Sequence, residues 1–191
     1  MATIQYHNLL LVLVAALLLC IARSSTNAQE TLDNNKPDRF WLNAGIGGGP
    51  LGFSAGASLC YKHENSIVSI RHVHNRELRL SLFDSTPSES VWDLGVLYGR
   101  IAEASYGTAS ISGGIAIVRG VRRGRSSRDR GWFATTKYEM DSFSAVGIPI
   151  EGQLFLTPHS WLGIGLVGFA NVNQERSFGG ALLCIRVGNL K

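Results

Sequence analysis

The sequence has little charge, few cysteines and few prolines. Of its 191 residues, 17% are charged, three are cysteines and five are prolines, whereas 45% are apolar. Disordered chains combine high charge with few apolar residues, so this composition predicts a folded chain. Three cysteines are too few for a disulfide scaffold, and the length allows about one domain. The length therefore argues against a multidomain enzyme.

Only one long apolar run is present, and it lies near the amino terminus. Residues 9–22 read LLLVLVAALLLCIA and are followed by small and polar residues. At about 14 residues the run is shorter than the ~20 that a membrane-spanning helix needs. It therefore predicts a secretory signal peptide over residues 1–28, cleaved near Ala28, and a short polar leader over residues 29–39. The alternative is an uncleaved membrane anchor.

The rest of the chain is rich in glycine and alternates apolar and small residues with a period of two. The clearest case is residues 143–156, where Val146 and Ile148 fall on one face and Gly147 and Pro149 on the other. This period is that of a β-strand and not of a helix. Eight strands are predicted, over residues 40–48, 51–61, 66–75, 91–101, 106–118, 143–156, 161–171 and 177–190.

The connections between these strands differ in length. Most short ones (62–65, 102–105 and 157–160) alternate along the chain with longer ones (76–90, 119–141 and 171–176), and 47–51 is a short exception. In an up-and-down meander, alternate connections lie at the same end. Tight turns at one end and loops at the other are typical of outer-membrane barrels.

The residue types on the two faces predict which face points outward. One face is Ile, Leu and Val, and the other is Gly, Ser and Ala with scattered charges. Small side chains suit the interior of a narrow eight-stranded barrel, and lipid can cover the aliphatic face. We therefore predict an all-β fold, a closed eight-stranded antiparallel up-and-down transmembrane β-barrel over residues 40–191. The alternative is a secreted, soluble, lipocalin-like carrier with the aliphatic face inside.

Aromatic residues fall near both ends of the predicted strands, as in the aromatic girdles of such barrels. Aromatics also gather at strand ends in other proteins, so this support is partial. The predicted girdles contain Phe40, Trp41, Tyr61, Tyr106, Phe155 and Trp161 at the tight-turn end, and Phe53, Trp92, Phe143, Phe169 and Phe178 at the loop end.

Several stretches resemble the small eight-stranded outer-membrane β-barrel proteins of bacteria with two membranes. They are FWLNAGIGG at 40–48, VWDLGVLYG at 91–99 and GGALLCIRVGNL at 179–190. The resemblance covers residues 40–191 and is specific in architecture but not in activity. We predict a non-enzymatic protein in contact with outer-membrane lipids, without a cofactor. Many such proteins end in an aromatic residue, whereas this chain ends in Asn189, Leu190 and Lys191. The resemblance leaves the oligomeric state open.

Four charged residues are predicted to point into the lumen. They are Arg71, Asp93, Glu151 and Arg186. An isolated buried charge costs several kcal/mol, so we expect a salt-bridge network that plugs the barrel. An ion path is the alternative, but eight strands leave little open lumen.

Cys60 and Cys184 are also expected to face inward, on the second and eighth strands. In a closed barrel the first strand separates them, which places them about 9–10 Å apart. A disulfide needs Cα atoms within ~7 Å, so we predict two free thiols.

His72 and His74 share one face near the loop end. They are candidates for a metal site or for the base of a lipid hydrolase on the barrel wall, as in barrels that carry a His-x-Ser dyad. Here the third position is His74 and not serine, so we favour a polar patch at the rim. The hydrolase is the alternative function.

Residues 119–141 hold all of the excess positive charge of the chain. Arginine forks match phosphate geometry, so this predicted outer loop is a candidate site for a surface polyanion such as lipopolysaccharide. A solvated loop is the alternative. Nucleic acid is disfavoured because export places the loop outside the cell and no aromatics interleave. The candidate residues are Arg122, Arg123, Arg125, Arg128 and Arg130.

Overall fold

The computed structural model describes residues 38–77, 88–128 and 136–190. The predicted signal peptide and almost all of the polar leader lie outside these ranges. The described residues form eight strands: β1 (Arg39–Gly49), β2 (Gly52–His63), β3 (Ser66–Arg76), β4 (Ser90–Ala104), β5 (Gly107–Arg128), β6 (Thr136–Leu156), β7 (Leu162–Asn173) and β8 (Phe178–Gly188). Within these ranges, no helix is long and apolar enough to cross a membrane.

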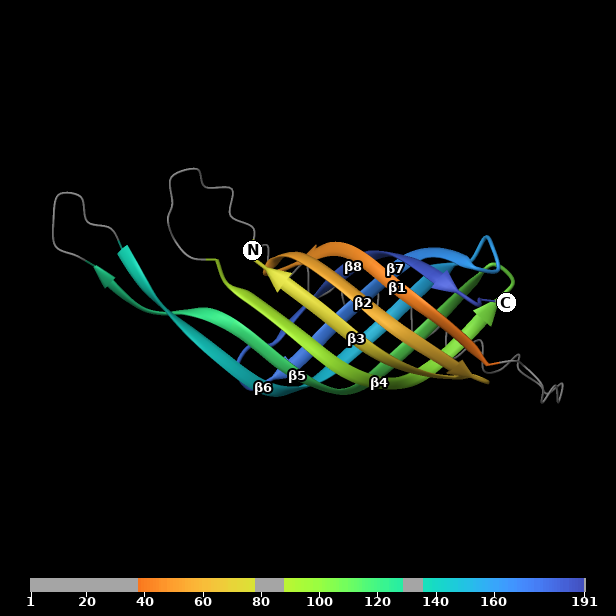
Figure 1. Cartoon of the computed structure of the whole chain (residues 1–191), viewed down its shortest axis with the longest axis horizontal. Coiled ribbons are helices and arrows are strands. Elements are labelled where there is room, and N and C mark those ends of the chain that lie inside the picture. Colours follow the sequence, from red (N-terminus) through yellow and green to blue (C-terminus); the bar gives the residue numbers. More distant parts are fainter. Residues whose placement is uncertain (1–37, 78–87, 129–135, 191) are drawn as a thin grey trace, which may run out of the picture. The chain divides into compact units, whose positions relative to one another are not determined.

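The eight strands close into a barrel (Figure 1). Each strand pairs antiparallel with its neighbours in the chain, and β8 closes the ring onto β1 through pairs from Trp41↔Gly188 to Gly48↔Ala181. Closure leaves no free sheet edge along the body of the barrel, so the backbone groups there are paired within the ring. The predicted fold class and all eight predicted strands are confirmed.

The predicted outer loop at residues 119–141 is largely β-structure, which corrects the sequence-based boundary. β5 continues to Arg128 and β6 begins at Thr136, with a register shift between Arg123 and Ser126. The neighbouring strands stop earlier, so the two arms continue as a ribbon beyond them (Figure 1). Each arm pairs with the other along one edge, without a third strand. The charged residues of the arms do not show the apolar alternation by which the other strands were predicted.

The aliphatic face points outward and the polar face points inward, as predicted. Ile115, Val146 and Ile148 are 64%, 65% and 60% exposed, whereas Arg71 and Glu151 are 1% and 2% exposed. A soluble barrel would bury its aliphatic side chains and expose its charges. The structure therefore contradicts the lipocalin-like alternative.

The predicted aromatic girdles are only partly correct. Phe40, Tyr106 and Trp161 are exposed, but four of the other predicted members are buried: Trp41, Phe155, Phe169 and Phe178. Alternation explains the difference, because successive residues of a strand point to opposite sides. Position near a strand end says nothing about which side a residue faces.

In the described ranges, the inside of the barrel contains two clusters of apolar side chains in addition to its polar groups. One contains Val73, Val91, Val118, Phe155, Val167, Phe169, Phe178, Leu182 and Cys184. The other contains Trp41, Cys60, Ile67, Ile101 and Leu190. Leu190 joins the second cluster because the tail folds back, with the Leu190 N–H donating to the Ser160 carbonyl at 2.8 Å. The lumen is therefore filled by side chains from all eight strands and from the tail.

Candidate functional site

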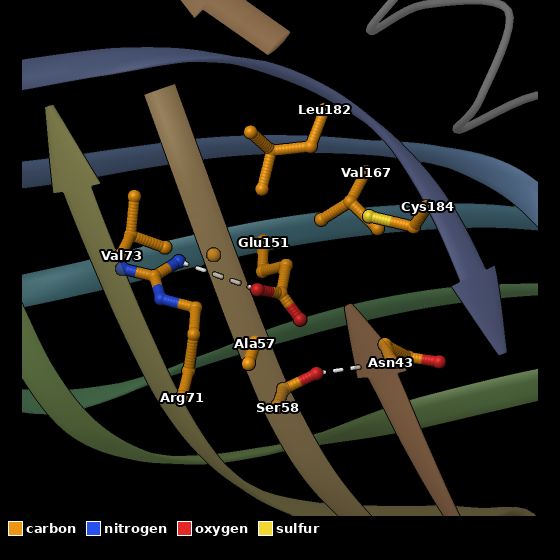
Figure 2. Close-up of a pocket in the computed structure, with 10 residues that line it drawn as sticks. Asn43, Ala57, Ser58, Arg71, Val73, Glu151, Val167, Leu182 and Cys184 are labelled. Carbon is orange, nitrogen blue, oxygen red and sulfur yellow. Dashed lines mark hydrogen bonds and ion pairs between the residues drawn. The ribbon is translucent and has the colours of Figure 1, made fainter. Parts of the chain in front are cut away.

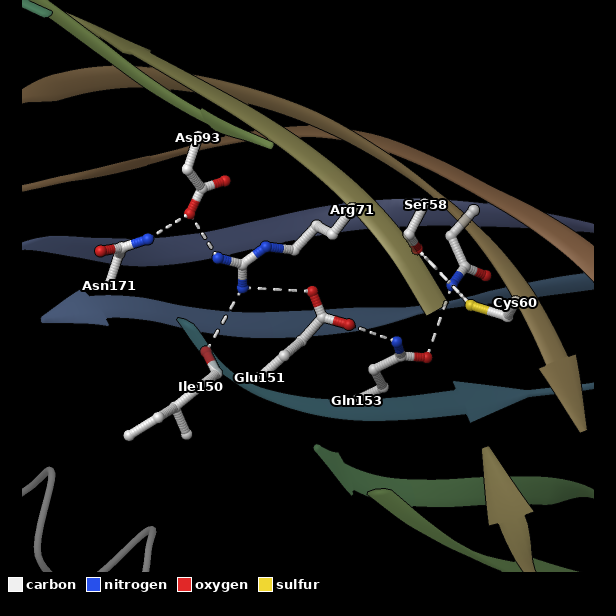
Figure 3. A network of polar contacts seen from close by, with 9 residues as sticks. Ser58, Cys60, Arg71, Asp93, Ile150, Glu151, Gln153 and Asn171 are labelled. Carbon is white, nitrogen blue, oxygen red and sulfur yellow. Dashed lines mark hydrogen bonds and ion pairs between the residues drawn. The ribbon is translucent and has the colours of Figure 1, made fainter. Parts of the chain in front are cut away.

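A buried ion-pair cluster centres on Arg71 of β3 (Figure 3). Its Nη2 lies 2.6 Å from Oδ2 of Asp93 on the adjacent β4, and its Nη1 lies 3.5 Å from Oε2 of Glu151 on β6. Asn171 of β7 donates a second hydrogen bond to the same Asp93 oxygen at 2.8 Å. One guanidinium thus faces two carboxylates, which leaves this trio with a net negative charge.

Neutral polar side chains extend the cluster around the lumen. Gln153 donates to Oε1 of Glu151 at 2.5 Å, and Asn43 donates to Oε1 of Gln153 at 3.4 Å and to the Ser58 hydroxyl at 3.1 Å. Gln153, Asn43 and Asn171 were not among the residues predicted for the lumen cluster. Each of these residues falls on an inward-facing position of its strand and carries an amide, and these two features could have identified it from the sequence. These amides connect charged groups that do not touch each other.

Arg186 of β8 is buried, as predicted, but lies apart from the ion-pair cluster. In the ranges that the structure describes, no carboxylate lies within 4.0 Å of its guanidinium. It donates to Gln153 at 2.6 Å, to Asn43 at 2.9 Å and to Thr108 at 2.8 Å. Two rings flank it, because its Cζ lies 3.6 Å from the Phe155 ring centroid and 4.7 Å from that of Trp41. The expected four-charge network is therefore an ionic trio joined to a stacked arginine through amides.

Replacing Arg186 with lysine is expected to lower the free energy of unfolding by about 1–3 kcal/mol. Lysine keeps the charge but loses the planar fork that reaches three acceptors while stacking on two rings. Urea titration of the barrel in vesicles measures the change. Arg100→Lys is the matched control, since Arg100 is exposed and its Nη1 donates to the Ser66 hydroxyl. Equal stability of the two variants would contradict the proposed contribution of stacking.

A small cavity lies beside the ion-pair cluster (Figure 2). Asn43, Ser58, Arg71, Glu151 and Cys184 line it, together with apolar side chains such as Val73, Val167 and Leu182. The Arg71 and Glu151 side chains reach toward each other across it. No group of three or more His, Cys, Asp or Glu side chains that could hold a metal occurs in the described ranges.

Cys60 and Cys184 are free and buried, as predicted. The Cys60 sulfur accepts a hydrogen bond from the Asn43 amide at 3.5 Å and lies 3.7 Å from the Ser58 hydroxyl. β1 separates β2 from β8, which accounts for the absence of a disulfide between them. Both thiols pack as small side chains among larger ones.

A buried lysine was not predicted. Lys62 was assigned to a turn, but β2 runs through it to His63, and its side chain is 1% exposed. Its Nζ lies 3.4 Å from Oε1 of Glu103, which also accepts a hydrogen bond from Arg39 at 2.9 Å. The turn itself begins at Glu64, where φ is +52°. This ion-pair group lies at the tight-turn end of the barrel.

At the other end, two of the five candidate arginines are paired with carboxylates. Arg122 lies 3.1 Å from Glu175, which precedes β8, and Arg123 forms an ion pair with Glu77. The Arg123 Nε also lies 3.5 Å from Glu89, which in turn pairs with Arg176 at 2.6 Å. We call Glu77, Glu89, Arg123 and Arg176 the rim clasp. The side chains of Arg125, Arg128 and Arg130 lie outside the described part of the structure.

The rim clasp is expected to lose strength in acid. Burial alone would raise the pKa of Glu89, but hydrogen bonds from the Arg123 N–H and the Arg176 side chain outweigh it and lower the pKa below its usual 4.5. A lowered pKa means that the stabilisation is complete above 4.5 and is lost as the pH falls through the lower folded value. The unfolding free energy of the Glu89→Gln variant should therefore depend less on pH below 4.5 than that of the wild type. Identical pH profiles would contradict this role.

The two histidines of β3 face outward but do not form a hydrolase dyad in the described residues. The Nδ1–H of His72 donates to the Asp93 carbonyl at 2.8 Å, and its ring meets the Trp92 ring edge-on at 5.7 Å. No serine hydroxyl of the described ranges hydrogen-bonds to His72 or His74. This geometry orients the His72 imidazole without supplying a nucleophile.

Solved structures of other proteins share the fold of this barrel. The N-terminal β-barrel domain of OprF from Pseudomonas aeruginosa matches with a TM-score of 0.52 and 9% identity, over 78% of this chain and 96% of that domain. The chain has the fold of the small eight-stranded outer-membrane barrels. At this identity the likeness concerns the fold alone.

Two further structures of this fold match the barrel less closely. Neisserial surface protein A matches with a TM-score of 0.49 and 9% identity, over 81% of this chain and 96% of that protein. The attachment invasion locus protein Ail of Yersinia pestis matches with a TM-score of 0.47 and 9% identity, over 79% and 94%. No protein-family model and no curated protein sequence matches the chain.

Proposed function

We propose that the protein is exported and acts in the bacterial outer membrane as a non-enzymatic β-barrel with a plugged lumen, in a structural or surface-interaction role. The observation that carries the proposal is the inverted distribution of side chains. Isoleucines, leucines and valines cover the outside, whereas Arg71, Asp93, Glu151 and Arg186 are all at most 2% exposed inside. Lipid acyl chains are the environment in which such an exterior is stable.

The proposed location is tested by fractionating cells that express the full chain. The protein should be recovered with the outer membrane and should migrate differently in gels when left unheated, because a closed barrel resists detergent. Edman sequencing of that fraction should begin near Gln29. Recovery as a soluble secreted protein would overturn the proposed location.

Filling of the lumen supports the plugged state. The ionic trio lies among apolar side chains, because Phe169 is the strand partner of Glu151 and Val73 is that of Asp93. A second apolar cluster, which contains Trp41 and Leu190, also fills the lumen. Eight strands leave an interior just wide enough for side chains. Planar-bilayer recordings of the purified barrel should show no stepwise conductance in KCl, with a porin as the positive control. Regular wild-type conductance steps would contradict the plug.

The proposal that the protein is not an enzyme rests on the surroundings of His72 and His74 on the outer wall. The Nδ1–H of His72 is held by a backbone carbonyl, and no described hydroxyl lies in hydrogen-bond contact with either imidazole. Incubation with phospholipid or lipid A should release no fatty acid, and His72→Ala should behave as the wild type. Fatty-acid release that is lost in this variant would favour the hydrolase.

The candidate polyanion site extends this surface role to the β5–β6 ribbon. The excess of arginine over acid at residues 119–141 supports it, although Arg122 and Arg123 are engaged by carboxylates. The remaining candidates are Arg125, Arg128 and Arg130. Their combined replacement by glutamine should weaken binding of lipopolysaccharide to the purified barrel, and unchanged binding would remove the site.

A further inference from the structure

Cationic and aromatic side chains gather on the outer wall of β3, β4 and β5, just below the rim clasp. In the pairing of the strands, His74 lies opposite Trp92, and Trp92 lies opposite Arg119. His74 and Arg119 are exposed, and the Cζ of Arg119 lies 6.0 Å from the Trp92 ring centroid. Exposed Arg76 lies two residues beyond His74 on the same face of β3. We call Arg76, His74, Trp92 and Arg119 the wall patch.

The two arginines of the wall patch have no acidic partner in the described part of the chain. No described carboxylate lies within ion-pair distance of Arg76 or Arg119, although the rim clasp beside them pairs both of its arginines. The row from His74 to Arg119 crosses two strand spacings, about 10 Å, and Arg76 lies two residues farther along β3. The long arginine side chains can therefore approach one anionic headgroup from two sides. Among the described residues no acidic side chain neutralises these two guanidiniums, so an anion from outside the chain can bind them.

The surroundings of the wall patch indicate the kind of anion. In the next row toward the middle of the barrel, exposed His72 on β3 is followed by Leu94, Ile117 and Val146, which are 48%, 54% and 65% exposed. An amphipathic ring such as Trp92 is typical of the level of the lipid headgroups. A ligand that covers both rows must carry an anionic head and an apolar tail.

The wall patch occupies one side of the barrel only. At the same end, the outward positions on the opposite side include Ile46, Val172 and Ala181, which are apolar. A general attraction to an anionic membrane would favour cations all round the ring, as in interfacial belts. A one-sided patch instead forms a local site.

We propose that the wall patch binds the phosphate headgroup of an anionic membrane lipid, with the Arg76 and Arg119 forks on the phosphate and the acyl chains along Leu94 and Ile117. The site rests on the proposed placement in a membrane but differs from the candidate polyanion site on the β5–β6 ribbon. Guanidinium forks match phosphate oxygens and form charge-assisted hydrogen bonds with them. The barrel would thereby hold one lipid on a defined face.

Native mass spectrometry of the detergent-purified barrel tests the site, with phosphatidylglycerol and zwitterionic phosphatidylcholine as the lipids. The wild type should bind phosphatidylglycerol in preference. The R76Q/R119Q variant should bind it about 25-fold more weakly, since each cation near an anionic lipid is worth about fivefold. Arg100→Gln is the matched control, because Arg100 is exposed on β4 at the opposite end.

The proposal would be overturned by equal wild-type binding of both lipids, by unchanged binding in R76Q/R119Q, or by an equal loss in Arg100→Gln. Glycerol phosphate that binds as tightly as the lipid would also overturn it, because the acyl chains would then contribute nothing. Heat-shifted gel mobility is recorded for every variant. A wild type that never enters membranes refutes the proposed function, whereas an inserted barrel without lipid preference refutes only this site.

Discussion

Replacing Arg71 with methionine is expected to lower the free energy of unfolding by about 3–5 kcal/mol, the cost of leaving buried carboxylates without their cation. Arg71 is the cation that contacts both Asp93 and Glu151, and all three side chains are at most 2% exposed. Asn171 and Gln153 would still donate to the two carboxylates, but a hydrogen bond from an amide does not neutralise a charge. Urea unfolding in phospholipid vesicles, followed by tryptophan emission, measures the change.

A triple variant separates charge from volume. R71M/D93N/E151Q removes the cation and both negative charges while keeping the side-chain sizes similar, and replacing a buried ionic group in this way is often neutral. It should recover most of the stability lost in Arg71→Met. A triple variant as unstable as the single one would show that packing of the arginine, and not its charge, matters in the lumen.

Replacing Ile115 with arginine should destabilise the barrel in vesicles by about 2–4 kcal/mol, as expected for a cation on the lipid face near the bilayer midplane. Ile115 is 64% exposed and pairs with Val96, which is 53% exposed, midway along the barrel portion of β5. In a water-soluble protein, an exposed isoleucine would tolerate arginine almost without cost. The same unfolding assay therefore tests the lipid-facing orientation directly.

A residue nearer the membrane surface than Ile115 provides the control for this prediction. Ala104 is exposed at the tight-turn end of β4, so Ala104→Arg should cost only about 0–1 kcal/mol, because the penalty falls toward the membrane interface. Equal costs at Ile115 and Ala104 would argue against a hydrocarbon layer around the middle of the barrel. The comparison needs no ligand and no knowledge of the biological partner.

The two kinds of cation in this barrel occupy different environments. Arg71 and Arg186 are enclosed in the lumen, where carboxylates, amides and rings satisfy them. Arg76 and Arg119 are exposed on the wall. Substitution of a lumen arginine should change stability, whereas substitution of a wall arginine should change lipid binding at nearly constant stability.

Much of the lumen site was predictable from parity. Arg71, Asp93, Glu151 and Arg186 were placed inside because each falls opposite the aliphatic positions of its strand. The predicted aromatic girdles were partly wrong because the alternation of the strands was not applied to them. Trp41 and Phe155 occupy inward-facing positions and are buried. The extent of the β5–β6 ribbon was missed because an arginine-rich strand has no apolar face to reveal its period.

By itself, the sequence determined the number of strands and the side to which each residue points, because a period of two is a local property of the chain. Only the tertiary structure decided that Arg71 meets Glu151 across the lumen and that Arg186 stacks between Trp41 and Phe155. Such contacts depend on the register accumulated around all eight strands and on closure of β8 onto β1. No local pattern carries that information, because a shift in one strand pair changes which inward side chains lie at the same height.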